Sequence, residues 1–383
     1  MSESIVSKLR PSKAQLKKIP KEHAIRDHLR EQILQTRLQA GAALPSMQEI
    51  AQLWESNYFT IHRALTPLVK EGLLVRHKGV GTFVADAKPK LETVGIYYGS
   101  DIISDPRHGY AIQLHRLLYQ ELKRKGLKIH TWLEPREMEE AQSEILPEVK
   151  QAAELQKIQA LVTIMTTTEV NKQMQSLPLP VVQFSSAPKS QNVYFPVREF
   201  LTLALQRASE KGYQTIGFIT SPSLLLTYIR KHNRSEAASF SIVQKLCAKA
   251  GLETRPSWYH SIDSGKLSQE EEKLQILDAY RKLQGKGKQK PDVVLIFPDN
   301  NLVTLQTALE ERQENCHPEL KIISHRNDPL AFPMPQGPYY IATSLKSVAE
   351  GLVKQVVDAS EGRPCPSIPA DLTEFEAISP LKA

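Results

Sequence analysis

Two groups of side chains in this sequence could do chemistry, and the first is a polar and aromatic cluster near the N-terminus. It places hydrogen-bonding groups and rings close together, at Asn57, Tyr58, Phe59, Thr60, His62 and Arg63. The glycine-containing loop that follows adds the charge of Lys78 and, at Gly79 and Gly81, backbone that can approach a phosphate closely. Such groups hydrogen-bond phosphates and base edges, and aromatic rings contact thymine methyl groups. We expect this set to bind double-stranded DNA.

The second group is spread over the rest of the chain, where polar residues follow short apolar runs. A saccharide needs paired donors and acceptors beside an aromatic face, which Asp299, Arg326 and Tyr98 could provide. The full candidate set is Tyr98, Ser100, Asp101, Thr166, Thr167, Ser185, Ser186, Thr220, Ser221, Asp299, Asn300, His325, Arg326 and Asp328. We expect these residues to bind a small-molecule effector, a sugar or sugar derivative.

The sequence lacks the common catalytic, cofactor and metal motifs. It contains no G-x-S-x-G, Walker or H-E-x-x-H pattern, and the glycine-containing run 284–290 lacks the spacing of a phosphate loop. Cys247, Cys316 and Cys365 form no C-x-x-C pair. We therefore expect no enzymatic activity, no cofactor and no metal, with reduced cysteines.

The charge of the chain is concentrated at its N-terminal end. Residues 1–90 carry 15 Lys and Arg against 8 Asp and Glu, while the remainder carries 49−15=34 against 42−8=34. A basic segment of this kind is typical of a phosphate-binding module, although a basic tail would give the same count. The first residues lack the apolar core of a signal peptide, and no run is long enough to cross a bilayer. A cytoplasmic protein without a membrane partner is expected.

The elements that would position the first group begin with two helices. Apolar residues recur every fourth position from Ile25, which predicts a helix over about 23–39 that ends at Gly41. Ser46 and Glu49 have the spacing of a capping box, so a short second helix should begin there.

A third helix and a hairpin complete the N-terminal pattern. Asn57 can cap a helix over about 58–71, and Pro67 predicts that this helix bends or ends early. Short strands are expected at 73–76 and 82–85, joined by a glycine-containing loop that can approach phosphate closely.

Residues 44–84, LPSMQEIAQLWESNYFTIHRALTPLVKEGLLVRHKGVGTFV, resemble the DNA-binding domain of the GntR family of bacterial transcription regulators. The resemblance implies a winged helix-turn-helix at residues 1–86, with DNA contacts from the start of the second helix, the first two turns of the third and the wing. The residues at these places are Ser46, Gln48, Tyr58, Phe59, Thr60, His62 and Gly79 to Thr82. Gln48, Tyr58 and His62 stand where the family commonly has arginine, and Glu55 where it has glycine. Since Gln pairs with adenine and Arg with guanine, the family's usual operator is not expected. A winged helix used only for protein contact is the alternative.

After a polar linker at 87–91, residues 92–383 read as a second domain. Apolar strands are expected at 94–98, 127–133, 161–165, 180–184, 216–220, 293–297 and 320–324. Helices are expected between them at 110–125, 197–211, 237–250, 269–284 and up to about 314. This alternation predicts parallel sheets covered on both faces, which bind ligands at the carboxyl ends of their strands. The series divides in two, with the second half opening near Gly212.

This second domain resembles the effector domain of the LacI/GalR family, through VGIYYGSD, ALQRASEKGYQTIGFIT, PDVVLIFPDNN and YYIATSLKSVAEGLVKQVVDASEG. The resemblance implies an α/β, two-lobed, periplasmic-binding-protein-like (type I) fold with a ligand cleft between the lobes. It also implies a homodimeric, allosteric repressor. Pro196-Val197 replaces the family's aspartate, the arginine after the sixth strand has no match, and the closing Arg-Ser-Thr is absent from Thr373 onward. The alternative is a ligand-independent DNA-binding dimer whose second domain serves only oligomerisation.

Overall fold

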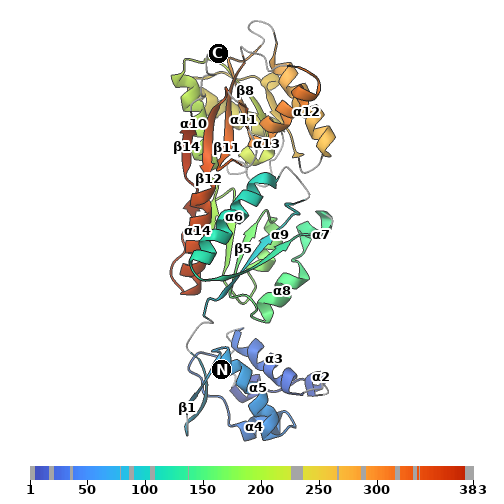
Figure 1. Ribbon diagram of the computed structural model, residues 1–383, viewed down its shortest axis with the longest axis vertical. Coiled ribbons are helices and arrows are strands. Elements are labelled where there is room, and N and C mark those ends of the chain that lie inside the picture. Colours follow the sequence, from blue (N-terminus) through green and yellow to red (C-terminus); the bar gives the residue numbers. More distant parts are fainter. Residues whose placement is uncertain are drawn as a thin grey trace.

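The protein has a mixed α/β fold, with a small helical N-terminal domain followed by two α/β lobes (Figure 1). The computed structural model describes residues 5–16, 21–34, 38–77, 79–85, 90–103, 108–136, 138–225, 236–264, 267–285, 290–314, 320–330, 334–335 and 337–375. The linker expected at 87–91 therefore lies mostly outside the described residues, as do Lys78 and Cys316.

The N-terminal domain contains five helices and a two-stranded hairpin within the described ranges. The helices are α1 (Ile5–Lys8), α2 (Lys13–Leu16), α3 (Lys21–Leu34), α4 (Met47–Leu53) and α5 (Tyr58–Lys70), and the antiparallel strands are β1 (Leu74–His77) and β2 (Gly81–Val84). Their apolar faces enclose one core around the fully buried Trp54, Ile61 and Leu65. The arrangement is that of a winged helix-turn-helix.

The predicted capped starts of the second and third helices are confirmed, whereas the predicted end of the first helix and the early end of the third at Pro67 are wrong. Ser46 and Glu49 form the capping box of α4, and Asn57 caps α5. Helix α3 spans Lys21–Leu34, and the N–H of Leu38 donates to the Gln32 carbonyl instead of continuing the helix to 39. Helix α5 runs past Pro67 to Lys70, so the proline does not end it early.

The first lobe is built on a parallel six-stranded sheet of order β13-β7-β6-β5-β3-β4. Its strands are β3 (Thr93–Tyr98), β4 (Lys128–Leu133), β5 (Ala160–Ile164), β6 (Val181–Ser185), β7 (Asn192–Tyr194) and β13 (Ile368–Pro369). Helices α6 (Gly109–Arg124) and α14 (Leu345–Ser360) cover one face. Helices α7 (Met138–Ser143), α8 (Pro147–Glu154) and α9 (Thr168–Met174) lie on the other side, where α8 and α9 pack into the core.

The second lobe repeats this plan on a sheet of order β14-β12-β11-β10-β8-β9. Its strands are β8 (Ile216–Thr220), β9 (Tyr259–Ser261), β10 (Val293–Ile296), β11 (Lys321–Asp328), β12 (Tyr339–Ser344) and β14 (Leu372–Phe375), of which β14 is antiparallel to β12. Helices α10 (Val197–Glu210) and α11 (Glu236–Lys249) pack on one face, and α12 (Gln269–Leu283) and α13 (Asp299–Glu311) on the other. Short 3-10 turns occur at Pro222–Leu225 and Pro256–Trp258.

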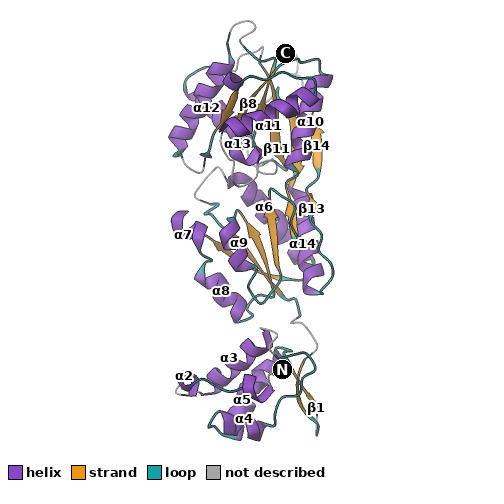
Figure 2. Ribbon diagram, turned by 180° about the vertical axis from the view of Figure 1, so that it is seen from behind, coloured by secondary structure: helices purple, strands orange, loops and turns teal. Residues whose placement is uncertain are grey.

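The chain passes between the lobes three times along its described path, so the expected division near Gly212 is wrong. Helix α10 already belongs to the core of the second lobe, whereas α14 returns to pack against α6 in the first. The segments that cross lie after β7, after β12 and between β13 and β14, and Figure 2 shows this side of the molecule. The second and third crossings were not predicted. They involve β12, α14, β13 and β14, which all follow the last strand that the apolar periodicity identifies.

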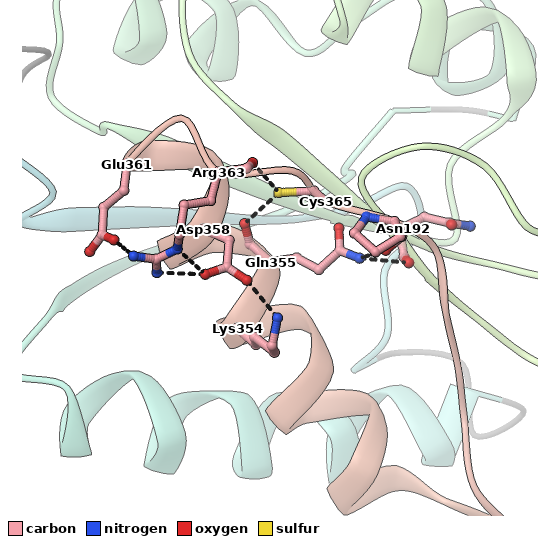
Figure 3. Close-up of polar contacts among 8 residues, drawn as sticks. Asn192, Lys354, Gln355, Asp358, Glu361, Arg363 and Cys365 are labelled. Carbon is pink, nitrogen blue, oxygen red and sulfur yellow. Dashed lines mark hydrogen bonds and ion pairs between the residues drawn. The ribbon is translucent and has the colours of Figure 1, made fainter.

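The segment after α14 is held to the first lobe by polar contacts (Figure 3). Gln355 on α14 donates from Nε2 to the carbonyls of Asn192 and Pro366. Asp358 accepts from Lys354 and Arg363, which lowers the pKa of its carboxyl. These bonds fix the direction in which the chain leaves α14 toward β13.

No helix within the described ranges is long and apolar enough to cross a membrane.

Candidate functional site

The start of α5 presents the exposed surface that the sequence predicts. Tyr58 is 48% exposed and Phe59 is 78% exposed, although both are large and apolar. The Tyr58 ring lies edge-on to Phe59 at 5.9 Å and stacks on His62 at 6.4 Å between ring centroids. The three rings therefore form a connected surface on the first turns of α5, where a recognition helix contacts the major groove.

His62 is held by Arg76 on the hairpin strand β1, a residue that the sequence reasoning missed. The distance from Arg76 Nη1 to His62 Nε2 is 3.1 Å. Because a guanidinium can only donate, His62 Nε2 is the acceptor in this contact. Arg63, the next residue on α5, pairs with Glu22 on α3 at 2.9 Å. Cross-element pairs of this kind leave no signal in local periodicity.

The capping residues keep part of their hydrogen-bonding capacity for a ligand. Ser46 Oγ accepts from the Glu49 N–H at 3.2 Å, so its own hydroxyl hydrogen remains available. Asn57 Oδ1 accepts from the N–H and the hydroxyl of Thr60, which leaves the Asn57 amide as a donor. Gln48 is exposed on the first turn of α4. These groups suit phosphate or base contacts beside the aromatic surface.

The tip of the hairpin is open, but one predicted contact faces inward. Gly79 has φ 77°, and Val80 beside it is 73% exposed. Gly81, at φ 150°, is also exposed, whereas Thr82 is buried at 9% exposure. Strand β2 begins at Gly81, one residue earlier than predicted, and its alternating side chains put Thr82 on the same buried face as Val84. Lys78 lies outside the described residues.

A cavity of about 490 Å³ lies between the two α/β lobes. The first lobe contributes Tyr110, Met165, Thr166, Thr167, Thr168, Asn171, Gln183, Phe184, Ser185, Ser186 and Lys189 to its wall. The second lobe contributes Phe297, Pro298, Asp299, His325, Asn327 and Thr343, and Phe195 belongs to the crossing segment between β7 and α10. The volume and the mixture of apolar and polar walls suit a small molecule.

Four of the residues on the second-lobe wall of the cavity are buried and polar. Asn327 Nδ2 donates to Asp299 Oδ2 at 2.6 Å, and His325 Nε2 lies 2.9 Å from Thr343 Oγ1. His325 Nδ1 lies 3.6 Å from Asp299 Oδ1 and has no hydrogen-bond partner in the described part of the chain. A buried carboxylate and a buried imidazole nitrogen thus retain capacity for a ligand that donates or accepts.

The opposite wall is also polar, and aromatic rings line the side between them. Thr166 Oγ1 donates to Asn171 Oδ1 at 2.8 Å, and Asn192 Nδ2 donates to Ser185 Oγ at 2.8 Å. Burial raises the pKa of Tyr110, and the Asp299 carboxylate raises it further, so its hydroxyl stays protonated. Phe195 and Phe297 stack at 5.6 Å and 21°, providing a flat apolar surface.

Six of the fourteen predicted effector residues meet in this cavity, namely Thr166, Thr167, Ser185, Ser186, Asp299 and His325. The structure places the other eight elsewhere: Tyr98, Ser100, Asp101, Thr220, Ser221, Asn300, Arg326 and Asp328. Tyr98 is buried in the first-lobe core beside His115, and Ser100 lies 3.5 Å from His108. Asp101 accepts from the Ile103 N–H, and Thr220 donates to the Ser221 carbonyl.

Strand β11 explains the division of the 325–328 cluster. It extends to Asp328, so successive side chains alternate between its two faces. His325 and Asn327 face the cavity, whereas the Arg326 guanidinium packs 3.5 Å from the centre of the Phe375 ring. The apolar pattern of the sequence predicts a strand only over 320–324, with the four polar residues in the loop after it. Recognising the longer strand would have selected Asn327, which was missed together with Tyr110, Asn171, Gln183, Lys189, Phe195 and Thr343.

The N-terminal domain is a GntR-type helix-turn-helix domain. Residues 21–84 match the family described as bacterial regulatory proteins, gntR family. The HTH-type transcriptional repressor NagR of Bacillus subtilis (strain 168) is 45% identical over 74 residues, which make up 19% of this chain and 30% of that protein. The matched segments span between 25% and 36% of the length of the curated relatives.

The two lobes have the fold of LacI-type, periplasmic-binding-protein-like regulators. A putative LacI transcriptional regulator from Bacillus cereus subsp. cytotoxis NVH 391-98 aligns with a TM-score of 0.56 and 14% identity, over 75% of this chain and 98% of that chain. A LacI family transcriptional regulator from Arthrobacter sp. FB24 aligns with a TM-score of 0.53 and 13% identity, over 75% and 100%. At these identities the similarity establishes the fold. The proteins matched by both kinds of comparison are regulators, not enzymes.

Proposed function

We propose that this protein is a sequence-specific transcriptional repressor whose DNA binding is controlled by a small molecule bound between the lobes. The observation that carries the proposal is the cavity lined by buried polar groups from both lobes, in a chain that also has a GntR-type DNA-binding domain. The protein would act as a homodimer on an operator in double-stranded DNA. Because its target is the chromosome of a bacterium, we place it in the cytoplasm.

The chemistry of the cavity supports a sugar or sugar derivative as the effector. Asp299 and His325 can bind hydroxyl groups, and the stacked Phe195 and Phe297 rings offer an apolar surface for a sugar ring. The structure from Arthrobacter sp. FB24 is a complex with lactose, and one from Alkaliphilus metalliredigens QYMF is a complex with D-xylulofuranose.

The proposed mechanism is closure of the lobes around the effector. Asp299 and Tyr110 reach the cavity from different lobes, so a ligand that contacts both binds the closed state more tightly. Only this differential affinity can shift the equilibrium between the two states. Closure would change the arrangement of two protomers and the spacing of their DNA-binding domains relative to the half-sites.

Selection of bound fragments from the source genome by the purified protein, followed by sequencing, tests the DNA-binding part of the proposal. We expect enrichment of a short palindrome near genes for transport or carbohydrate metabolism. Binding without enrichment over a salt-sensitive background would contradict sequence-specific regulation.

Thermal unfolding with a panel of sugars and phosphosugars tests the effector. A ligand that binds only the native state raises the melting temperature. At a concentration a hundred times its Kd it increases the free energy of unfolding by about 2.7 kcal/mol. Enrichment of a palindrome without any sugar-induced shift would instead favour a ligand-independent DNA-binding dimer or a non-sugar effector.

A further inference from the structure

We infer that residues 5–16, which precede the family-matched domain, are a second DNA-binding element that contacts the phosphate backbone. This segment, the N-terminal arm, contains α1 and α2, and the gntR family match begins after it at residue 21. The inference rests on the proposed DNA binding and adds a contact surface to it. The charge count in the sequence fits either a basic tail or a basic DNA-binding domain. In this inference both contribute, because a basic segment precedes a winged helix.

The basic charge of the N-terminal region lies largely outside the winged helix itself. Residues 21–84 carry 8 Lys and Arg against 6 Asp and Glu, an excess of 8−6=2. Residues 1–20 carry 5 Lys and Arg against 1 Glu, an excess of 5−1=4. Neutralisation of phosphates supplies most of the non-specific affinity for DNA. The larger part of that electrostatic attraction is therefore available in and beside the arm.

The arm is anchored on the domain rather than extended away from it. Leu9 is fully buried in the core of the winged helix, and its carbonyl accepts from Trp54 Nε1 at 3.1 Å. His28 on α3 lies 3.1 Å from the Lys8 carbonyl through Nε2 and 3.1 Å from Gln15 Nε2 through Nδ1. One neutral tautomer, with hydrogen on Nε2, satisfies both contacts. These contacts hold the backbone of the arm against the domain before DNA arrives.

The anchoring point lies beside the start of the recognition helix. Trp54 caps the C-terminal end of α4, and α5 begins at Tyr58 directly after the turn. Both views of the molecule place α2 and the hairpin strand β1 on opposite sides of the domain (Figures 1 and 2). DNA that contacts the start of α5 would have the wing on one side and the arm on the other.

Two cations of the arm have the exposure that a phosphate contact requires. Arg10 directly follows the buried Leu9, and Lys13 begins α2. Both residues are exposed, and neither forms an ion pair with a carboxylate among the described residues. Binding to phosphate therefore breaks no ion pair between these two residues and a described carboxylate.

The test compares the full-length Arg10→Ala/Lys13→Ala variant with the wild type by fluorescence anisotropy on a random-sequence DNA duplex at several salt concentrations. We expect weaker binding, and a plot of log K against log salt whose slope is smaller by about 0.9 for each phosphate that the protein no longer neutralises. Lys245→Ala/Lys249→Ala is the matched control, since it removes two exposed cations from α11 in the second lobe. Its binding should equal that of the wild type.

The outcomes separate the arm from the DNA-binding function as a whole. If the arm variant keeps the affinity and slope of a wild type that binds duplex, the arm is not a DNA contact, and the proposed function stands. An equal loss in the α11 control would show an effect of net charge alone and would also overturn the inference. A wild type that binds no duplex would overturn the proposed function itself. Thermal unfolding of the arm variant should match the wild type because both side chains are exposed.

Discussion

At the scale of single residues, Asp299 should be the side chain on which effector binding depends most. Its carboxylate is 5% exposed, accepts from Asn327 and faces His325 Nδ1 at 3.6 Å. In Asp299→Ala the ligand loses this acceptor, and the Asn327 amide is left unpaired, which costs about 1–3 kcal/mol for a buried group. We expect the variant to lose the thermal shift produced by the most stabilising sugar while it retains DNA binding.

Asn300→Ala is the control for this substitution. Asn300 is the next residue on α13 and lies outside the cavity wall, so its variant should keep the wild-type thermal shift. An unchanged sugar response in Asp299→Ala, measured on a folded protein, would exclude the carboxylate from the effector site.

Tyr58 should distinguish operator from non-operator DNA. The ring is 48% exposed at the start of α5 and stacks on His62, which suits contact with base edges rather than phosphate. Tyr58→Ala should therefore cost about 1–3 kcal/mol in operator affinity and much less on random DNA. Anisotropy titrations on both duplexes measure the two losses. Equal losses would remove Tyr58 from base readout.

The residue types predict that the first turns of α5 contact DNA, but they do not predict which neighbouring residues contact the α5 side chains. The exposure of Tyr58 and Phe59 followed from helical periodicity, since Ile61 and Leu65 occupy the buried face. The pairing of His62 with Arg76 depends on how the hairpin folds back onto α5, which no local pattern records. Thr82 was selected from the family resemblance alone, and the structure places its side chain on the buried side of β2.

At the scale of elements, the C-terminal half of α14 should control the stability of the first lobe. Gln355 is 1% exposed, and its Nε2 donates to two carbonyls, one of them on β7 (Figure 3). Gln355→Ala leaves both carbonyls without this donor, so we expect the free energy of unfolding to fall by about 2 kcal/mol. Urea denaturation measures the change. Lys346→Ala, on the exposed side of the same helix, should have little effect, and equal stability of the two variants would contradict the assigned role.

Helix starts could be predicted from the sequence because their signals are local. The end of a strand could not, because it depends on pairing with a neighbouring strand. The caps of α4 and α5 were identified because their side chains satisfy backbone groups within three residues. The end of β11 was misplaced because β12 extends the pairing to Asp328, beyond the apolar part of the strand. The polar residues at the end of β11 therefore have the sequence pattern of a loop.

At the scale of the whole molecule, the two-domain plan followed from the sequence, but the assignment of segments to lobes did not. The contrast between a basic N-terminal quarter and alternating apolar strands is enough to separate the two domains. The lobes exchange segments, so α14 packs on α6 although more than 200 residues separate them. Periodicity cannot reveal contacts of that range, and the cavity between the lobes depends on them.

The proposed homodimer needs an exposed surface that can meet its own copy, and α6 carries two exposed apolar side chains. Ile112 and Tyr119 are each 46% exposed and lie seven positions apart, so they share one face of the helix. In a two-fold dimer this face would meet its own copy and set the spacing of two DNA-binding domains. The exposed pair is therefore the place where a charge should separate the protomers.

Ile112→Glu/Tyr119→Glu should give a monomer in light scattering, because four carboxylates would meet in the interface. The monomer should bind a palindromic operator no better than a half-site, a loss of about a hundredfold or more, since linked binding sites gain effective concentration. Leu155→Glu/Leu274→Glu is the matched control, with two exposed leucines on other surfaces. If the α6 variant stays dimeric and keeps its preference for the palindrome, the protomers meet elsewhere, and lobe closure must reach the DNA-binding domains through a different surface.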